Sequence, residues 1–288
     1  MKPKYRLYAL LAAIALWSPL TVLAQNFSNE VYETRAFSDR FKTIRTDVEG
    51  RDLFPPIIEL NSNEHITISF DEMTEEASYL QYSLIHCNAD WRPSALSELE
   101  YLDGFNTNPI ETFDYSIATF AHYVHYSLTL PNEDVQFKAS GNYVLLVYPE
   151  NEPEQILLQV CFSVYENDIL VAPSVTSRTD IDYNSEHQQV SVSLNANNYR
   201  IQNPYNELKV SVTPNGRRDQ EVIVTRPLRV QGNQVIFDHD RNLIFEAGNE
   251  FRRFEMVATR YAGLGVSKIY HFDPYYHVVL TTTEPRAE

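Results

Sequence analysis

Apolar and polar residues alternate along most of this chain. In residues 65–73, HITISFDEM, the apolar Ile66, Ile68 and Phe70 are separated by polar residues. A period of two residues places successive side chains on opposite faces of a β-strand. The same alternation recurs in residues 79–87, 122–131 and 156–166, and residues 141–149 are predicted to form a buried strand that opens at Gly141 and is stopped by Pro149. Residues 30–166 are therefore predicted to form an antiparallel β-sandwich of about seven strands.

A second series of alternating segments follows a break at residues 166–175. It begins with HQQVSVSLNA and continues with similar segments towards the C-terminus, and no stretch keeps the i, i+3, i+4 spacing of an amphipathic helix. The predicted fold class is all-β, with two consecutive antiparallel β-sandwich, immunoglobulin-like domains after a signal peptide. The predicted boundaries are residues 1–24 for the signal peptide, 25–168 for the N-terminal domain and 169–288 for the second domain.

The N-terminus predicts export from the cytoplasm. Three basic residues precede an apolar run over residues 7–17, and Val22 and Ala24 occupy the −3 and −1 positions of a cleavage site before Gln25. The apolar run is shorter than the ~20 residues of a membrane-spanning helix. We therefore expect a cleaved signal peptide, a soluble mature chain and no direct membrane insertion.

Composition narrows the classes of function. The formal net charge is −16 at pH 7, and the signal peptide contributes three basic residues and no acidic ones. Such a surface repels phosphate backbones, so we expect no nucleic-acid partner. The chain has only 8 Gly but 19 Tyr, which disfavours glycine-rich phosphate loops and favours strands.

The stretch LIHCNADW, residues 84–91, concentrates residue types that catalyse reactions or bind metals. Neighbours in a strand point to opposite faces, so His86 is poorly placed to activate Cys87. The sequence has no CxxC and no HExxH motif, and we expect no metal here. Cys87 and Cys161 either form one disulfide, as an exported chain allows, or pack as two buried thiols. Trp91 is expected to anchor the following loop on the core.

Two acidic segments, residues 180–184 and 238–242, share the spacing D-x-D-x-N. An EF-hand calcium loop also needs Gly at its sixth position and Glu at its twelfth, and both segments lack them. We expect solvated turn carboxylates, with a looser calcium site as the alternative. The sequence also has no G-x-S-x-G motif and no P-loop. We predict no catalytic, cofactor-binding or metal-binding residues, and no enzyme.

The long connection over residues 88–113 interrupts the rhythm of the strands. Long loops in compact domains are often functional. Residues 94–99 could form one helical turn with Ser94 as its cap. Tyr101, Leu102 and Phe105 follow among acids and amides, and we predict them as a partner contact. The alternative is that these three side chains pack over an open edge of their own domain.

Several longer phrases stand out: YETRAFSDRFKTIR, LFPPIIEL, IHCNADW, YLDGFNTNPIE, HYSLTLPNEDVQFKASGNYVLLVY, RTDIDYNSEHQQVSVSLN, RNLIFEAGNEFRRFE and FDPYYHVVL. Together, from about residue 32 to residue 280, they resemble the type IX secretion system plug protein family of Bacteroidetes. The resemblance implies a non-enzymatic periplasmic protein built of β-sandwich modules. Its partner would be the outer-membrane β-barrel translocon, whose periplasmic opening it would seal. Family members usually continue beyond FDPYYH, which leaves the completeness of the second domain open.

A glycan-binding β-sandwich protein of the cell envelope is the alternative function. Sugar platforms usually present two or three aromatic side chains on one face, whereas Trp91 is the single Trp outside the predicted signal peptide. An acidic, Tyr-rich chain is better suited to docking on a protein.

Overall fold

The computed structural model describes residues 31–51, 54–184, 186–248 and 253–282. The predicted signal peptide, residues 1–24, lies outside the described residues. The chain separates into two compact units, Met1–Asn167 and Asp168–Glu288. Strands dominate both units, and their pairing is antiparallel apart from one parallel pair, β3 with β12, among the described strands. The prediction of an all-β, antiparallel fold is confirmed.

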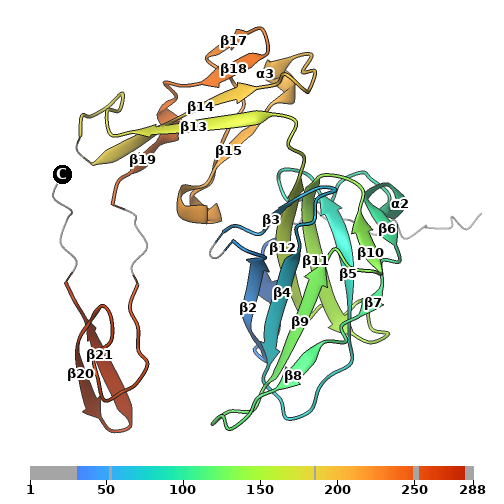
Figure 1. Cartoon of the computed structure of the whole chain (residues 1–288), viewed down its shortest axis with the longest axis vertical. Coiled ribbons are helices and arrows are strands. Elements are labelled where there is room, and N and C mark those ends of the chain that lie inside the picture. Colours follow the sequence, from blue (N-terminus) through green and yellow to red (C-terminus); the bar gives the residue numbers. More distant parts are fainter. Residues whose placement is uncertain (1–30, 52–53, 185, 249–252, 283–288) are drawn as a thin grey trace, which may run out of the picture. The chain divides into compact units, whose positions relative to one another are not determined.

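Two sheets face each other in the first unit (Figure 1). The first has the order β1-β12-β11-β5-β7, with β3 beside β12: β1 (Arg35–Ala36), β3 (Ile57–Glu59), β5 (Leu80–Cys87), β7 (Asn108–Pro109), β11 (Gly141–Pro149) and β12 (Leu158–Tyr165). The second has the order β2-β4-β9-β8: β2 (Phe41–Val48), β4 (Ile66–Glu72), β8 (Phe113–Tyr115) and β9 (Val124–Leu130). A short pair, β6 (Leu102–Gly104) with β10 (Val135–Phe137), and one helical turn, α2 (Glu98–Tyr101), complete the unit.

The core of this unit lies between the two sheets. Ile66, Ile68 and Phe70 of β4 are fully buried, as the alternation predicts. They belong to one apolar cluster with Tyr82 and Leu84 of β5, on the opposite sheet. Aromatic rings make part of this packing, because Phe70 stacks on Tyr126 with ring centroids 5.2 Å apart. Side chains that alternate inwards from both sheets thus produce the sandwich.

The second unit is built around a sheet of order β13-β14-β18-β17, with β19 beside β14. Its strands are β13 (Leu170–Thr176), β14 (His187–Asn195), β17 (Arg229–Gln231), β18 (Gln234–Phe237) and β19 (Ile244–Glu246). Two further pairs are β15 (Val210–Val212) with β16 (Val222–Val224), and the hairpin of β20 (Val266–Phe272) with β21 (Tyr275–Leu280). The short helical elements are α3 (Pro204–Glu207), η1 (Pro214–Gly216), η2 (Arg218–Gln220) and η3 (Arg241–Leu243).

The predicted break at residues 166–175 is wrong in part, because most of it forms β13. This strand contains Pro173, although proline cannot donate a backbone hydrogen bond to a sheet. Among the described strands β13 pairs only with β14, so it is an edge strand there. An edge strand tolerates proline because one of its sides needs no partner. All seven residues of β13 are exposed.

The buried core of the second unit is smaller than that of the first. Its buried members are Val192, Leu194, Val224, Val235, Phe237 and Leu243. Among the described residues of the whole chain, no helix has the length and apolarity needed to cross a membrane.

Candidate functional site

The strand end that carries His86 and Cys87 is part of the core. His86 is 7% exposed, and its Nε2 lies 3.0 Å from the carbonyl oxygen of Ser140. A carbonyl only accepts, so Nε2 carries the hydrogen. Nδ1, 2.7 Å from the Oγ of Ser94, then accepts from that hydroxyl in the neutral ring. The rings of Tyr101 and Tyr143 pack against the imidazole. His86 therefore serves packing and leaves no ring nitrogen for a substrate.

The two cysteines lie on the other face of the same sheet, as the strand geometry predicts. Cys87 and Cys161 are buried thiols that pack with Val144, under the partly buried Tyr32 and Trp91. Of the two alternatives left open by the sequence, the structure has the thiols. The pKa of the Cys87 thiol is raised to about 12. Burial is the largest cause, and the nearby charges of Cys161 and Asp90 add to it. A thiol with this pKa is a poor nucleophile at neutral pH.

The loop over residues 88–113 closes the free edge of β5. Only Gln81 and Tyr82 of β5 pair with β7. Further along, the side chain of Asn106 takes the place of a neighbouring strand: its Oδ1 accepts from the backbone N–H of Leu84 at 2.7 Å, and its Nδ2 donates to the Leu84 carbonyl at 2.8 Å. Tyr101 donates its hydroxyl to the same carbonyl at 3.0 Å. An open edge invites pairing with another chain, and this loop prevents it.

The helical turn of this loop differs from the prediction. It spans Glu98–Tyr101, and its cap is Ser97 rather than Ser94. The hydroxyl and backbone N–H of Ser97 both donate to the carboxylate of Glu100, at 2.7 Å each. Ser94 lies ahead of this turn, where its hydroxyl bonds the Nδ1 of His86 and accepts from the backbone N–H of Leu96 at 3.2 Å.

The three predicted contact residues do not form one surface. Tyr101 and Leu102 are 5% and 3% exposed and belong to the core cluster, whereas Phe105 is 84% exposed. Two buried side chains cannot contact a partner while the loop keeps this conformation, so the contact hypothesis reduces to Phe105. Leu99, which was not among the predicted contact residues, is 79% exposed on the same loop.

A groove of about 610 Å³ lies between this loop and the sheet. Its lining includes the polar Ser97, Glu98 and Asn106 beside the aromatic Tyr101 and Tyr148. Sugar sites use exposed ring faces for stacking, but both tyrosines are buried. The described residues of the groove therefore offer hydrogen bonds without an aromatic platform.

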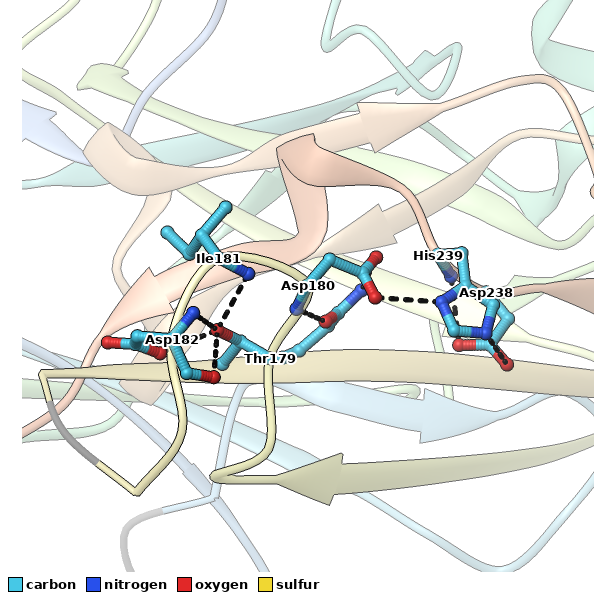
Figure 2. Close-up of polar contacts among 7 residues, drawn as sticks. Thr179, Asp180, Ile181, Asp182, Asp238 and His239 are labelled. Atoms are coloured by element: carbon cyan, nitrogen blue, oxygen red, sulfur yellow. Dashed lines mark hydrogen bonds and ion pairs between the residues drawn. The ribbon is translucent and has the colours of Figure 1, made fainter.

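The two acidic segments of the second unit are brought together in space (Figure 2). Asp180 lies 2.8 Å from the Nδ1 of His239, on the loop after β18. Its second carboxylate oxygen accepts from the side chain of Gln189 at 2.8 Å, and Gln189 in turn accepts from the Asp180 backbone N–H. Asp182 accepts from the hydroxyl of Thr179 and lies 2.8 Å from the Nδ1 of His187. The shared D-x-D-x-N spacing gave no sign of this pairing.

These hydrogen bonds change the pKa values of Asp182 and His239. The Thr179 hydroxyl, followed by His187, lowers the pKa of Asp182 to about 2. The hydrogen bond to Asp180 and the charge of Asp238 raise the pKa of His239. The carboxylate oxygens of Asp180 and Asp182 are thus already bonded by protein donors. Over the described part of the chain, no group of three or more His, Cys, Asp or Glu residues is arranged to hold a metal ion.

The fold defines the class of this chain: an all-β protein whose first unit is a β-sandwich. The comparisons with known proteins agree with this class. Residues 41–166 match the family model described as the type 9 secretion system plug protein 1st domain. The resemblance to the plug family is thereby confirmed, and the matched residues run from the start of β2 to just beyond β12.

Among solved structures, a hypothetical protein from Parabacteroides merdae ATCC 43184 is 42% identical, with a TM-score of 0.81. The match covers 87% of this chain and 63% of that one, so the chain spans less than two thirds of that protein's length. An alkylpurine DNA glycosylase AlkC from Pseudomonas fluorescens, bound to DNA containing an abasic site analog, reaches 9% identity over 43% of this chain and 30% of its own, with a TM-score of 0.25. That score is too low to carry an argument. No curated protein matches the chain.

Proposed function

We propose that this protein is a non-enzymatic, exported subunit that docks on the outer-membrane β-barrel translocon of the type IX secretion system. There it closes the periplasmic opening of the barrel. The observation that carries this proposal is the match of residues 41–166 to the first domain of the plug protein. In this proposal a signal peptide exports the chain to the periplasm, and a protein contact retains it at the outer membrane.

Physical properties of the described units support a docking role. The reactive residue types that the sequence concentrates at β5 are used in packing, since His86 and Cys87 are 7% and 0% exposed. The net charge of −16 disfavours contact with phosphate-rich partners. Large apolar side chains remain exposed in loops of the first unit, and such side chains are typical anchors of protein interfaces.

Conductance provides the test. The purified translocon barrel is reconstituted in a planar bilayer, and the full chain is added to its periplasmic side. We expect the ionic conductance of the open barrel to fall as the protein binds, in proportion to occupancy. Addition to the extracellular side serves as the control and should leave the conductance unchanged. A conductance that stays constant at saturating protein would contradict the plug function.

A further inference from the structure

The loop that joins β8 to β9, residues 116–123, carries unusually exposed apolar side chains. Ile117 and Phe120 are 87% and 107% exposed, and the adjacent Tyr115 at the end of β8 is 54% exposed. Single exposed apolar residues are ordinary on protein surfaces. Three large ones within six residues form a local patch, which typically marks a contact with another molecule. We call Tyr115, Ile117 and Phe120 the apolar tip.

The apolar tip has a defined conformation. The backbone N–H of Ser116 donates to the carbonyl of Tyr123 at 2.9 Å, and the N–H of Tyr123 donates back to the Ser116 hydroxyl at 3.0 Å. Thr119 donates its hydroxyl to the carbonyl of Ala121 at 2.8 Å. Ala118, between the two apolar residues, has φ of 55°, a left-handed conformation that is unfavourable for a residue with a Cβ. Such conformations often occur at functional positions.

The surroundings of the tip add contact area. The loop between β4 and β5, residues 73–79, exposes Met73 by 40% and Tyr79 by 83%. A pocket of about 300 Å³ separates this loop from the tip; its lining residues are Thr74, Glu75, Tyr115, Ser116, His122 and Tyr123. The same end of the first unit therefore offers protruding apolar side chains beside a hollow, a shape that an interlocking partner can match.

This end of the unit lies opposite the end that carries α2 (Figure 1). The α2 end contains the exposed Leu99 and Phe105, which makes it the rival docking surface. The loop at the α2 end, however, stabilises its own domain, because Asn106 and Tyr101 form hydrogen bonds with the open edge of β5. The tip has no comparable task, since its hydrogen bonds join residues of its own loop.

Charge indicates the kind of partner. Residues 73–79 and 111–123 contain the acids Glu75, Glu76, Glu111 and Asp114, all exposed, and no Lys or Arg. The adjacent Arg40, which bonds Ser78, is paired with the buried carboxylate of Glu72. An anionic lipid surface repels such a rim. A protein with an apolar pocket bordered by Lys and Arg complements both the apolar side chains and the acidic rim.

We propose that the apolar tip is the part of this protein that enters the translocon partner, at an apolar pocket bordered by basic side chains. The proposal rests on the proposed plug function and assigns the docking surface to the β8–β9 end of the first unit. Ile117 and Phe120 are the anchors, and Glu75 and Glu76 contribute to the acidic rim.

The test compares matched pairs of substitutions in the full chain. Ile117→Ser with Phe120→Ser removes the anchors, while Leu99→Ser with Phe105→Ser removes an equivalent aliphatic and aromatic pair at the rival end. A third variant, Glu75→Lys with Glu76→Lys, reverses the rim charge. The dissociation constant is measured by biolayer interferometry against the purified translocon barrel at two salt concentrations. Because the substituted side chains are exposed, each variant should keep the melting temperature of the unchanged protein.

We expect the tip pair to weaken binding by about tenfold or more, as truncation of interface anchors does, and the α2-end pair to leave it unchanged. The rim variant should bind more weakly at low salt, with less difference at high salt. If the unchanged protein binds but the tip pair binds equally well, the tip proposal is wrong and the plug function stands. If the unchanged protein does not bind the barrel, both proposals fall.

Two further outcomes would also overturn the assignment. Co-sedimentation with vesicles of phosphatidylethanolamine and phosphatidylglycerol that is lost in the tip pair would make the tip a membrane contact. A concentration-dependent dimer that the tip pair abolishes, measured by light scattering, would make it a contact between copies of the chain.

Discussion

The Nδ1 of His239 lies 2.8 Å from a carboxylate oxygen of Asp180, although the two residues stand 59 positions apart. This contact links the loop after β18 to the loop between β13 and β14 (Figure 2). It crosses the surface of the second unit, whose buried apolar core is small. Polar links between loops should therefore matter more for this unit than for the first.

Stability of the second unit should depend on pH through His239. Its pKa is raised above 6.5 in the folded protein, so the charged ring favours folding. A raised pKa gives a contribution that is fully present below the unfolded value and is lost as the pH rises through the folded value. We expect His239→Gln to lower the melting temperature most at pH 5.5 and least at pH 9. Calorimetry across this range checks the prediction, and an effect independent of pH would contradict it.

The buried carboxylate of Glu72 in the first unit is bonded by Arg40 and Ser78 at one oxygen and by Tyr126 at the other. Glu72 is 1% exposed and accepts the Tyr126 hydroxyl at 2.9 Å, while that hydroxyl accepts from the Ser78 backbone N–H at 2.7 Å. Tyr126→Phe leaves both partners short of a bond, which costs about 1–3 kcal/mol for buried groups. Urea denaturation of the full chain measures the loss. The control is Tyr115→Phe at the exposed tip, which we expect to change stability by no more than about 0.5 kcal/mol.

Of the predicted contact residues, Tyr101 and Phe105 should differ in how much they contribute to the free energy of unfolding. Tyr101 is buried with its hydroxyl bonded to Leu84, whereas Phe105 is 84% exposed. Tyr101→Ala should destabilise the isolated protein by roughly 3–5 kcal/mol, as for other buried aromatic residues. Phe105→Ala should remain within about 0.5 kcal/mol. Similar losses for both variants, measured by denaturant titration, would contradict the burial described here.

Strand positions could be predicted from the sequence because their signal is local. The alternation of Ile66, Ile68 and Phe70 reports directly which side chains of one strand face the core, and all three are fully buried. The strand over Leu170–Thr176, which contains Pro173, was not predicted. Pro173 is acceptable only because β13 is an edge strand, and the position of a strand within a sheet depends on residues distant in sequence.

Contacts between distant residues could not be predicted in the same way. The D-x-D-x-N spacing identified Asp180 and Asp238, but the interaction of Asp180 with His239 depends on how β14 and β18 pair. The sequence predicted Ser94 as the helix cap, whereas the cap in the structure is Ser97. The hydroxyl of Ser94 bonds His86 instead, a contact that the spacing of the two residues did not predict. The apolar tip was not predicted, because apolar residues such as Ile117 and Phe120 are normally assigned to the core when only the sequence is known.

Gly141 lies directly against the ring of His86. Gly141 has φ of 149°, and a Cβ at this position would clash with the Nε2 of His86. Because that nitrogen donates to the carbonyl of Ser140, the ring cannot shift without losing a buried hydrogen bond. Gly141→Ala should therefore destabilise the first unit by roughly 2–5 kcal/mol, from backbone strain and overpacking together.

A matched control isolates the clash. Gly50 also has a positive φ, 74°, but open space surrounds the position of its Cβ. Gly50→Ala should cost roughly 1–2 kcal/mol, which reflects the left-handed backbone alone. In a double-mutant cycle, Gly141→Ala should cost less in a His86→Ala background than in the unchanged protein, because the clashing ring is absent. Equal costs in the two backgrounds, measured by urea denaturation, would show that the imidazole is not what selects glycine at position 141.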